Sequence, residues 1–425
     1  MGQASAAGVG AASLASAAVG YVVIVVAART LDKQDNAAFL TFWAVVFLVI
    51  GVLGGIAVET TRAAKSSRNL DESAPQAPGG PRRPRMGPVA LVIGLAAGIV
   101  LAALSPLWGP PIFGSYAGTL VPVVCVTAVF YAGHAVMMGQ LGGQQRWGMY
   151  SRLIASESAV RLAVLAAVVL IGASVANLAW ATAAGVAAWL LFMLFSPQSR
   201  GTFMLRADTG TRQYLRTIWH ACMAAAASAS LVVGFPVLLR LTTSDGVYLE
   251  SAALLMALSL TRAPLMIPLQ AYQGVAITHF MSRRSEGLKA VAPIFGLVLA
   301  VAVVGAVAAW IIGPWLMTTI FGEHYAMSGP VLAALTFDAG FLALLTLTGA
   351  LTIALNRHRA YSLGWVSACL VSFAMLWLPL DIEARTVLSL AAGPLCGIAV
   401  HLWVIIRTSP RPAAPGGPKP AIPGT

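Results

Sequence analysis

The feature that most constrains this chain is a series of apolar runs, each about 20 residues long. "LTFWAVVFLVIGVLGGIAV", residues 40–58, contains no charged residue. A helix of about 20 apolar residues crosses the roughly 30 Å hydrocarbon core of a bilayer. Charged residues make up only 9% of the 425 residues, whereas soluble domains carry about 25%. The sequence therefore predicts an all-α polytopic membrane protein of the cytoplasmic (cell) membrane.

The runs predict about twelve transmembrane helices. They lie near residues 8–28, 37–58, 88–107, 117–139, 153–172, 174–196, 217–239, 247–276, 291–313, 328–352, 361–380 and 386–406. The connections alternate in charge, because twenty Lys and Arg residues fall on one side and only Arg29, Lys33, Arg240 and Arg385 on the other. Basic loops remain in the cytoplasm, so we expect cytoplasmic N- and C-termini. The net charge of +12 then needs no nucleic-acid partner.

The chain is expected to divide into two halves and a tail. Residues 1–200 form a first six-helix unit, which contains a polar, Pro- and Gly-rich stretch at 66–88 that is typical of a flexible cytoplasmic linker. Residues 201–408 form a second six-helix unit. Residues 409–425 have the composition of a disordered cytoplasmic tail.

Matches at nearly half the chain length suggest that the two units are repeats. Arg29 and Arg240 each close the first helix of a unit and are 211 positions apart. "PIFGSYAG" resembles "TIFGEHYAMSG", with Phe113 and Phe321 208 positions apart. Because each unit has an even number of helices, both cross the membrane in the same direction. We therefore predict two six-helix bundles related by a pseudo-two-fold axis along the membrane normal.

Three segments carry a resemblance to a known family. They are "ARTLDKQDNAAFLTFWAVVFLVIGVLGG", "GQLGGQQRWGMYSRLIASESAVRL" and "FGEHYAMSGPVLAAL". The chain resembles, from Ala4 to Arg407, the multidrug/oligosaccharidyl-lipid/polysaccharide exporter superfamily, in particular its lipid-linked oligosaccharide flippases. The resemblance implies a central cavity lined by the first, second, seventh and eighth helices, and an exchange between inward-open and outward-open states.

An arginine lies in the middle of the eighth predicted helix. Arg262 is 17 residues beyond Asp245 and 21 before Arg283, so its side chain cannot easily reach either membrane surface. A mid-membrane arginine costs at least about 2.5–3.5 kcal/mol on insertion scales. Pro264 and Pro268 predict a kink beside it. Arg262 is therefore expected either to face a cavity and hold an anionic group, such as a lipid diphosphate, or to form a buried ion pair.

Three further charges lie inside apolar runs. Asp338, near mid-depth of the tenth helix, is either the buried partner of Arg262 or a site for a coupling ion. Glu157 and Arg161 are four residues apart and so share one face of the fifth helix. This spacing predicts a buried pair, with ion coupling as the alternative.

The resemblance implies that other polar residues of the cavity helices contact substrate. Arg62 closes the second helix at the cytoplasmic side, and Arg29 closes the first at the other side. Gln270 and Gln273 follow Arg262 on the eighth helix and fit either hydrogen bonds to sugar hydroxyls or a position at the membrane interface. Arg62 also fits simple anchoring at the cytoplasmic face, and the match of Arg29 with Arg240 also fits an architectural role.

These features favour a flippase that moves a lipid-pyrophosphate-linked glycan by alternating access, with membrane lipids and envelope-glycan synthesis proteins as further partners. A drug or cation antiporter of the same superfamily, a membrane glycosyltransferase or ligase, and a scaffold of glycan synthesis are the alternatives. The short outer loops argue against the transferase, and "DKQD" at 32–35 is typical of a solvated turn. No catalytic residue, metal site or cofactor is predicted.

Overall fold

The predicted all-α polytopic fold is confirmed by a computed structural model that describes residues 3–71, 83–262, 265, 292–355 and 357–408. Within these ranges the chain forms helices joined by short turns, and one isolated β-bridge joins Arg85 to Arg206. Gln270 and Gln273 lie outside the described residues, as do the two prolines after Arg262 and the predicted tail.

The first half of the chain contributes nine α-helices. They are α1 (Gln3–Thr30), α2 (Lys33–Asp71), α3 (Met86–Ala103), α4 (Ser105–Phe113), α5 (Ala117–Gly143), α6 (Trp147–Ile171), α7 (Val175–Ala184), α8 (Trp189–Phe195) and α9 (Pro197–Phe203). Short 3₁₀ turns follow α4 and α7, at Gly114–Tyr116 and Gly185–Ala187. The stretch 66–88 that the sequence predicts as a linker is helical at both edges, because α2 continues through Asp71 and α3 begins at Met86.

The second half is also helical. Its described helices are α10 (Thr211–Val232), α11 (Phe235–Leu241), α12 (Asp245–Leu249), a helix at Ala252–Arg262, α14 (Ala292–Phe321), α15 (Gly329–Ala354), α16 (His358–Met375) and α17 (Ile382–Thr408). Among the described residues, 8 helices are long and apolar enough to cross a membrane, or up to 10 if each bent pair forms one span. The count of twelve stays a prediction.

The sequence does not predict where three helices break, and the sixth predicted helix, 174–196, bends by 45° between Val175–Ala187 and Trp189–Phe195. The seventh predicted helix, 217–239, is not one straight helix: α10 and α11 meet at 73°. Pro236 lies in the first turn of α11, where its missing N–H does no harm, and it cannot continue the hydrogen bonds of α10. The eighth, 247–276, is also interrupted, because α12 ends at Leu249 and the next helix begins at Ala252.

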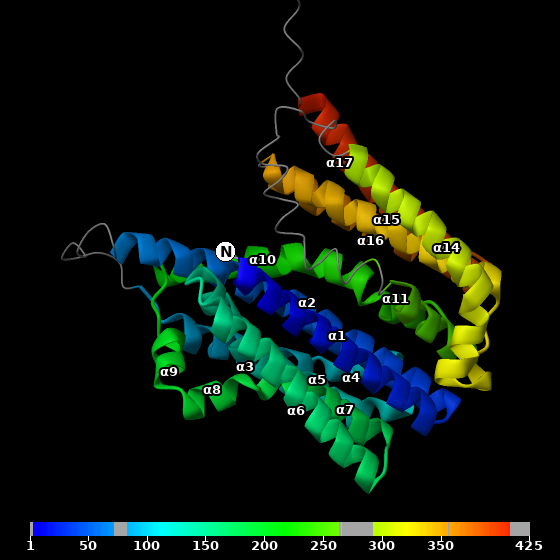
Figure 1. Cartoon of the computed structure of the whole chain (residues 1–425), viewed down its shortest axis with the longest axis horizontal. Coiled ribbons are helices and arrows are strands. Elements are labelled where there is room, and N and C mark those ends of the chain that lie inside the picture. Colours follow the sequence, from blue (N-terminus) through cyan, green and yellow to red (C-terminus); the bar gives the residue numbers. More distant parts are fainter. Residues whose placement is uncertain (1–2, 72–82, 263–264, 266–291, 356, 409–425) are drawn as a thin grey trace, which may run out of the picture.

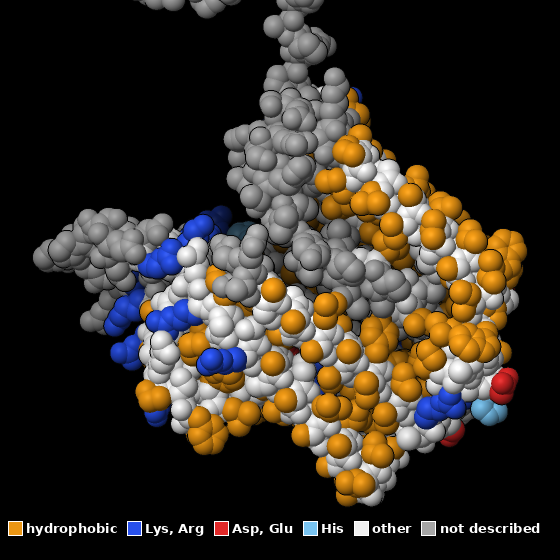
Figure 2. Space-filling model, viewed as in Figure 1, with side chains coloured by type: hydrophobic (Ala, Val, Ile, Leu, Met, Phe, Trp, Pro, Cys, Tyr) orange, Lys and Arg blue, Asp and Glu red, His pale blue; other side chains and the backbone are white. Residues whose placement is uncertain are grey.

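The helices form two groups (Figure 1). Helices α1–α9 make up one group and α14–α17 the other, while α10 and α11 lie along α2. We call the end that carries Arg62, Arg146 and Arg206 the basic end, and the opposite end, with Arg29 and Arg240, the Arg29 end. Figure 2 shows most visible Lys and Arg side chains at the basic end, over the ends of α2 and α9. Towards this end the axes of α14–α17 diverge from α1 and α2.

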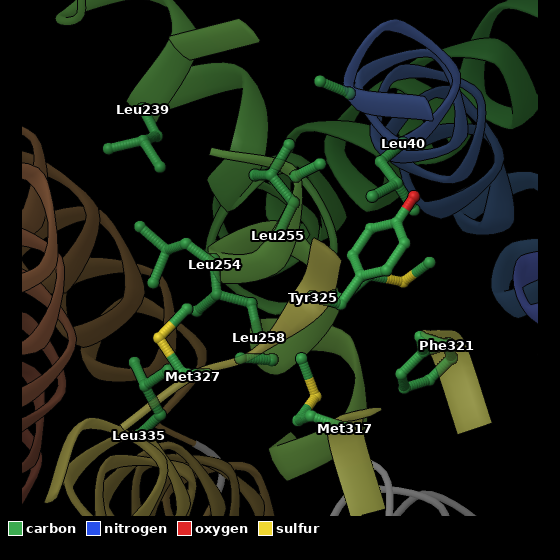
Figure 3. Close-up of a cluster of buried hydrophobic side chains, with 14 of the residues drawn as sticks. Leu40, Leu239, Leu254, Leu255, Leu258, Met317, Phe321, Tyr325, Met327 and Leu335 are labelled. Carbon is green, nitrogen blue, oxygen red and sulfur yellow. The ribbon is translucent and has the colours of Figure 1, made fainter. Parts of the chain in front are cut away.

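At the Arg29 end a hydrophobic cluster joins the two halves (Figure 3). Leu40 of α2 and Ile24 of α1 are buried there against side chains of the second half. The labelled members from the second half are Leu239, Leu254, Leu255, Leu258, Met317, Phe321, Tyr325, Met327 and Leu335. Since buried apolar area favours association, this cluster holds the Arg29 end closed.

Candidate functional site

A cavity of about 320 Å³ lies between the two halves. Its wall comes from α1, α2, α6, the α10–α11 junction and the helix Ala252–Arg262. Four of these five elements belong to the first, second, seventh and eighth predicted helices, which the sequence resemblance implies as cavity helices. The volume falls at the lower end of the range of small-molecule pockets, about 300–1,000 Å³.

Arg262 lines this cavity and is anchored on the bend of the seventh span. Its Nη1 donates to the carbonyl oxygens of Leu231 and Val232, both at 3.1 Å. Because α10 ends at Val232, these carbonyls lack partners within the helix and carry its negative dipole end. The guanidinium also lies 5.3 Å from the ring centre of Phe235. The side chain is thus held in place, while Nη2 is buried without a hydrogen-bond partner among the described residues.

Asp338 does not provide that partner. It is buried in α15 and does not line the cavity, and among the described residues it forms no ion pair with Arg262 within 4.0 Å. Its Oδ2 is also buried without a hydrogen-bond partner in the part of the chain described. In this structure Arg262 lines the cavity, while Asp338 acts on it through the electrostatic field without an ion pair within 4.0 Å.

On the opposite wall, Arg161 and Glu157 form the pair expected from their spacing. Arg161 Nη2 lies 2.6 Å from Glu157 Oε1, and its Nε donates to the carbonyl of Thr182 at 3.3 Å. Glu157 Oε2 also lies 3.4 Å from His134 Nε2 of α5. Both members of the pair line the cavity. Sequence reasoning missed His134, because its contact with Glu157 joins different helices and no spacing in the sequence indicates it.

Aromatic side chains make up much of the remaining wall. Trp43 and Phe47 are one turn apart on α2, with ring centres 4.6 Å apart, and Arg161 lies over the Phe47 ring at 5.9 Å. Tyr21 of α1 donates to the carbonyl of Ser259 at 2.9 Å across the two halves. The i, i+4 spacing of Trp43 and Phe47 is a signal from which this aromatic face could have been predicted.

Arg29 lies outside the cavity, and its contacts are the counterpart of those of Arg240. Arg29 Nε donates to Ile320 at 2.7 Å, and its Nη2 to Thr319, both in the last turn of α14. Arg240 Nε donates at 3.1 Å to Ile112, in the last turn of α4. Each arginine thus caps a helix end of the other half, and Ile112 and Ile320 lie in the two similar sequence segments. The arrangement agrees with the predicted repeat, and the contact of Arg29 joins the two halves.

Arg62 also lies away from the cavity, at the basic end. It pairs with Glu59 at 2.6 Å and with Asp208 at 2.8 Å, and so connects α2 to the segment before α10. Burial alone favours neutral Asp208, but hydrogen bonds from Arg62 and Ser66 hold the pKa of this carboxyl below its ordinary value. The two acids therefore compensate the charge of Arg62, whose side chain remains 48% exposed. Within the described ranges no cluster of side chains is suited to a metal ion.

Solved structures show which class of protein has this fold. An inward-facing multidrug resistance MATE family transporter of the MOP superfamily is similar over 92% of this chain and 96% of its own, with a TM-score of 0.68 and 14% identity. A MOP superfamily transporter from Pyrococcus furiosus Vc1, described by a reverse polarity of its binding pocket, is similar over 95% of both chains, with a TM-score of 0.66 and 16% identity. The chain therefore has the fold of the MATE-like membrane transporters, which exchange inward- and outward-facing states.

Sequence relatives give the family. The uncharacterized protein Rv3630 of Mycobacterium tuberculosis H37Rv is 41% identical over 95% of this chain and 92% of its own length. The uncharacterized protein Rv1510 of the same strain is 40% identical over the same shares. No family model matches the chain. The chain belongs to the family of these mycobacterial proteins, and it is a multi-pass membrane protein.

Proposed function

We propose that the chain is a flippase that carries a lipid-linked oligosaccharide or polysaccharide precursor across the cytoplasmic membrane by alternating access. The observation that carries this proposal is the charge of the cavity. Glu157 is neutralised by Arg161, whereas Arg262 has no acid within ion-pair distance among the described residues. Among the described residues the wall therefore carries one positive charge without a directly paired acid, which favours an anionic substrate group over a cationic drug.

The lining suits the two parts of such a headgroup. The Arg262 guanidinium lines the cavity and is already oriented by the α10 carbonyls, so it suits charge-assisted hydrogen bonds to a diphosphate. The Trp43–Phe47 face offers an apolar surface to the carbon face of a sugar ring. The lipid chain stays in the bilayer, because removing it would forfeit about 0.8 kcal/mol for each buried methylene.

The contacts at the Arg29 end define the state that the structure represents. The hydrophobic cluster and the helix caps of Arg29 and Arg240 close this end. Given the predicted cytoplasmic position of the basic end, we infer an inward-facing state that receives substrate from the cytoplasm. Release on the other side then requires the caps to break and the cluster to separate.

The test is a reconstituted flipping assay with a fluorescent lipid-diphosphate-linked sugar. Purified full-length protein is placed in liposomes, and the labelled lipid that reaches the opposite leaflet is quantified by quenching. We expect Arg262→Gln to slow flipping about tenfold or more, because a lost charge-assisted hydrogen bond is worth at least about 1.4 kcal/mol. Arg407→Gln is the matched control, since the one contact described for Arg407 is with Trp403, outside the cavity.

Two outcomes contradict the proposal. If the wild-type protein leaves the labelled lipid in its original leaflet but transports a cationic dye, the chain is an antiporter of the same fold. If Arg262→Gln and Arg407→Gln flip the lipid as fast as the wild type, the cavity arginine does not hold the substrate.

A further inference from the structure

A second pocket opens at the basic end, separate from the cavity between the halves. It has a volume of about 490 Å³ and is lined by the end of α2, the start of α3, Gln144 and the segment that follows α9. Three arginines line it, Arg68, Arg83 and Arg206, and none of its lining residues in the described part of the chain is a carboxylate. It shares no lining residue with the cavity that contains Arg262.

Among the described residues, the arginines of this pocket differ from their neighbours in their partners. Arg62, which lies two turns before Arg68 on α2, is paired with two carboxylates. Arg146 donates to the Thr202 hydroxyl at 2.8 Å. By contrast, neither Arg68 nor Arg83 has an ion pair in the described part of the chain. Arginines that line one pocket and have no ion pair among the described residues repel one another, so an anion in the pocket would relieve this cost.

The pocket wall is a fixed frame outside the helices. Backbone hydrogen bonds of 2.9 Å join Met86 to Leu205 and Ala207 to Pro84, on either side of the Arg85–Arg206 bridge. Arg206 Nη1 donates to the carbonyl of Arg83 at 2.7 Å, which holds its guanidinium at the wall. The site is therefore preorganised before a ligand arrives.

The remaining lining indicates the class of ligand. Ala64, Met86 and Ala207 are fully buried and form an apolar wall next to the arginines. The Gln144 Oε1 is buried without a partner among the described residues, and rotation of this amide would place an NH₂ donor there instead. Guanidinium groups, an amide donor and an apolar wall at the end of a membrane-spanning helix match a phosphate attached to a glyceride.

We propose that this pocket binds a phosphate group, presented by an anionic phospholipid headgroup or by free phosphate, independently of what the central cavity transports. The test uses the purified full-length chain in a zwitterionic detergent at 150 mM salt. Phosphatidylglycerol and inorganic phosphate are titrated separately, and binding is followed by the rise in unfolding temperature. Binding of the lipid alone assigns the phosphate to the membrane, whereas binding of both assigns the site to phosphate as such.

The variant is Arg68→Gln with Arg83→Gln, and the matched control is Arg212→Gln with Arg216→Gln. The control removes the same charge from the same end, at two exposed residues outside the pocket. We expect the dissociation constant to rise at least about tenfold in the pocket variant and less than about twofold in the control. Equal changes in both variants, or no binding to the wild type, would overturn the proposal.

A second measurement needs no variant. Phenylglyoxal modifies accessible arginines, and peptide mass spectrometry locates the modified residues. Bound ligand should protect Arg68, Arg83 and Arg206, while Arg212 and Arg216 stay reactive. Protection that is uniform across all five arginines would show general charge screening and contradict a site.

Discussion

The two halves meet along the middle of α2 and at the Arg29 end, but the contacts differ in kind. In the middle of α2, its main chain approaches α10 closely: a Cβ atom added at Gly51 would lie 2.7 Å from that of Ala229, and one at Gly55 would collide with the backbone of Cys222. At the Arg29 end the contacts are made by side chains, from Arg29, Arg240 and Lys33. Side-chain contacts break one at a time, whereas main-chain contacts open only when whole helices separate.

Arg29 and Arg240 occupy equivalent positions in the two halves, but their burial and their contacts differ. Arg240 is 7% exposed, pairs with Asp245 at 2.7 Å and stacks on Tyr248 at 5.1 Å, besides its bond to α4. Arg29 is exposed, and the bonds described for it are those to the end of α14. We therefore expect Arg240 to serve mainly stability and Arg29 to serve as the releasable contact.

The largest effect is expected at Arg240. Arg240→Ala removes a buried charged hydrogen bond and a cation–π contact, so the free energy of unfolding should fall by about 2–4 kcal/mol. Unfolding in detergent, followed by circular dichroism, measures the change. Arg29→Ala is the matched variant at the equivalent position and should cost less than half as much. If the free energy of unfolding falls equally in the two variants, Arg240 does not contribute more to stability than Arg29, and the prediction is wrong.

The next largest effect tests the main-chain contact. Gly55→Ala places a methyl group against the backbone of α10, and such overpacking costs about 1–3 kcal/mol. Gly54→Ala is the control, because its added methyl lies no closer than 4.0 Å to another group, the Tyr131 hydroxyl. The same unfolding measurement should show a loss for the first variant and none for the second. A tolerated Gly55→Ala would mean that α2 and α10 separate readily.

A smaller change is expected in the population of states when Arg29 is replaced. Spin labels at Ile171 and Val247, both exposed and in different halves, report the separation at the Arg29 end in a cysteine-free background. Arg29→Ala loses exposed hydrogen bonds worth about 0.5–1.5 kcal/mol, so the open fraction should rise about two- to tenfold. Arg200→Ala, an exposed arginine at the basic end, should leave the distances unchanged. Unaltered distances in Arg29→Ala would argue against a releasable cap.

The sequence predicts some of these contacts and not others, for physical reasons. Apolar runs of sufficient length predict the spans, and the 211-residue offset predicts that Arg29 and Arg240 are equivalent. The 73° bend before α11 escapes prediction, since both sides of it are apolar and the break involves only two residues, Val233 and Gly234. The anchoring of Arg262 depends on that bend, because the bend frees the carbonyls that it contacts. The sequence therefore predicts a polar cavity residue but not what orients it.

The smallest effect is expected from the exposed pair of Lys33 and Glu250, which joins the halves at 2.8 Å. Hydrogen bonding to Lys33 holds the pKa of Glu250 below its ordinary value, so the ionised pair favours the closed Arg29 end at neutral pH. This contribution is lost as the pH falls through the lowered pKa, since protonation removes the charge. Exposed pairs are weak, so the open fraction reported by the same spin labels should rise only slightly on acidification.

The variant Glu250→Gln separates this pair from other titrating groups. It should show the small rise in the open fraction already at neutral pH, and this pair should cause no further change at low pH. If Glu250→Gln keeps the pH dependence of the wild type, another group of the Arg29 end is titrating.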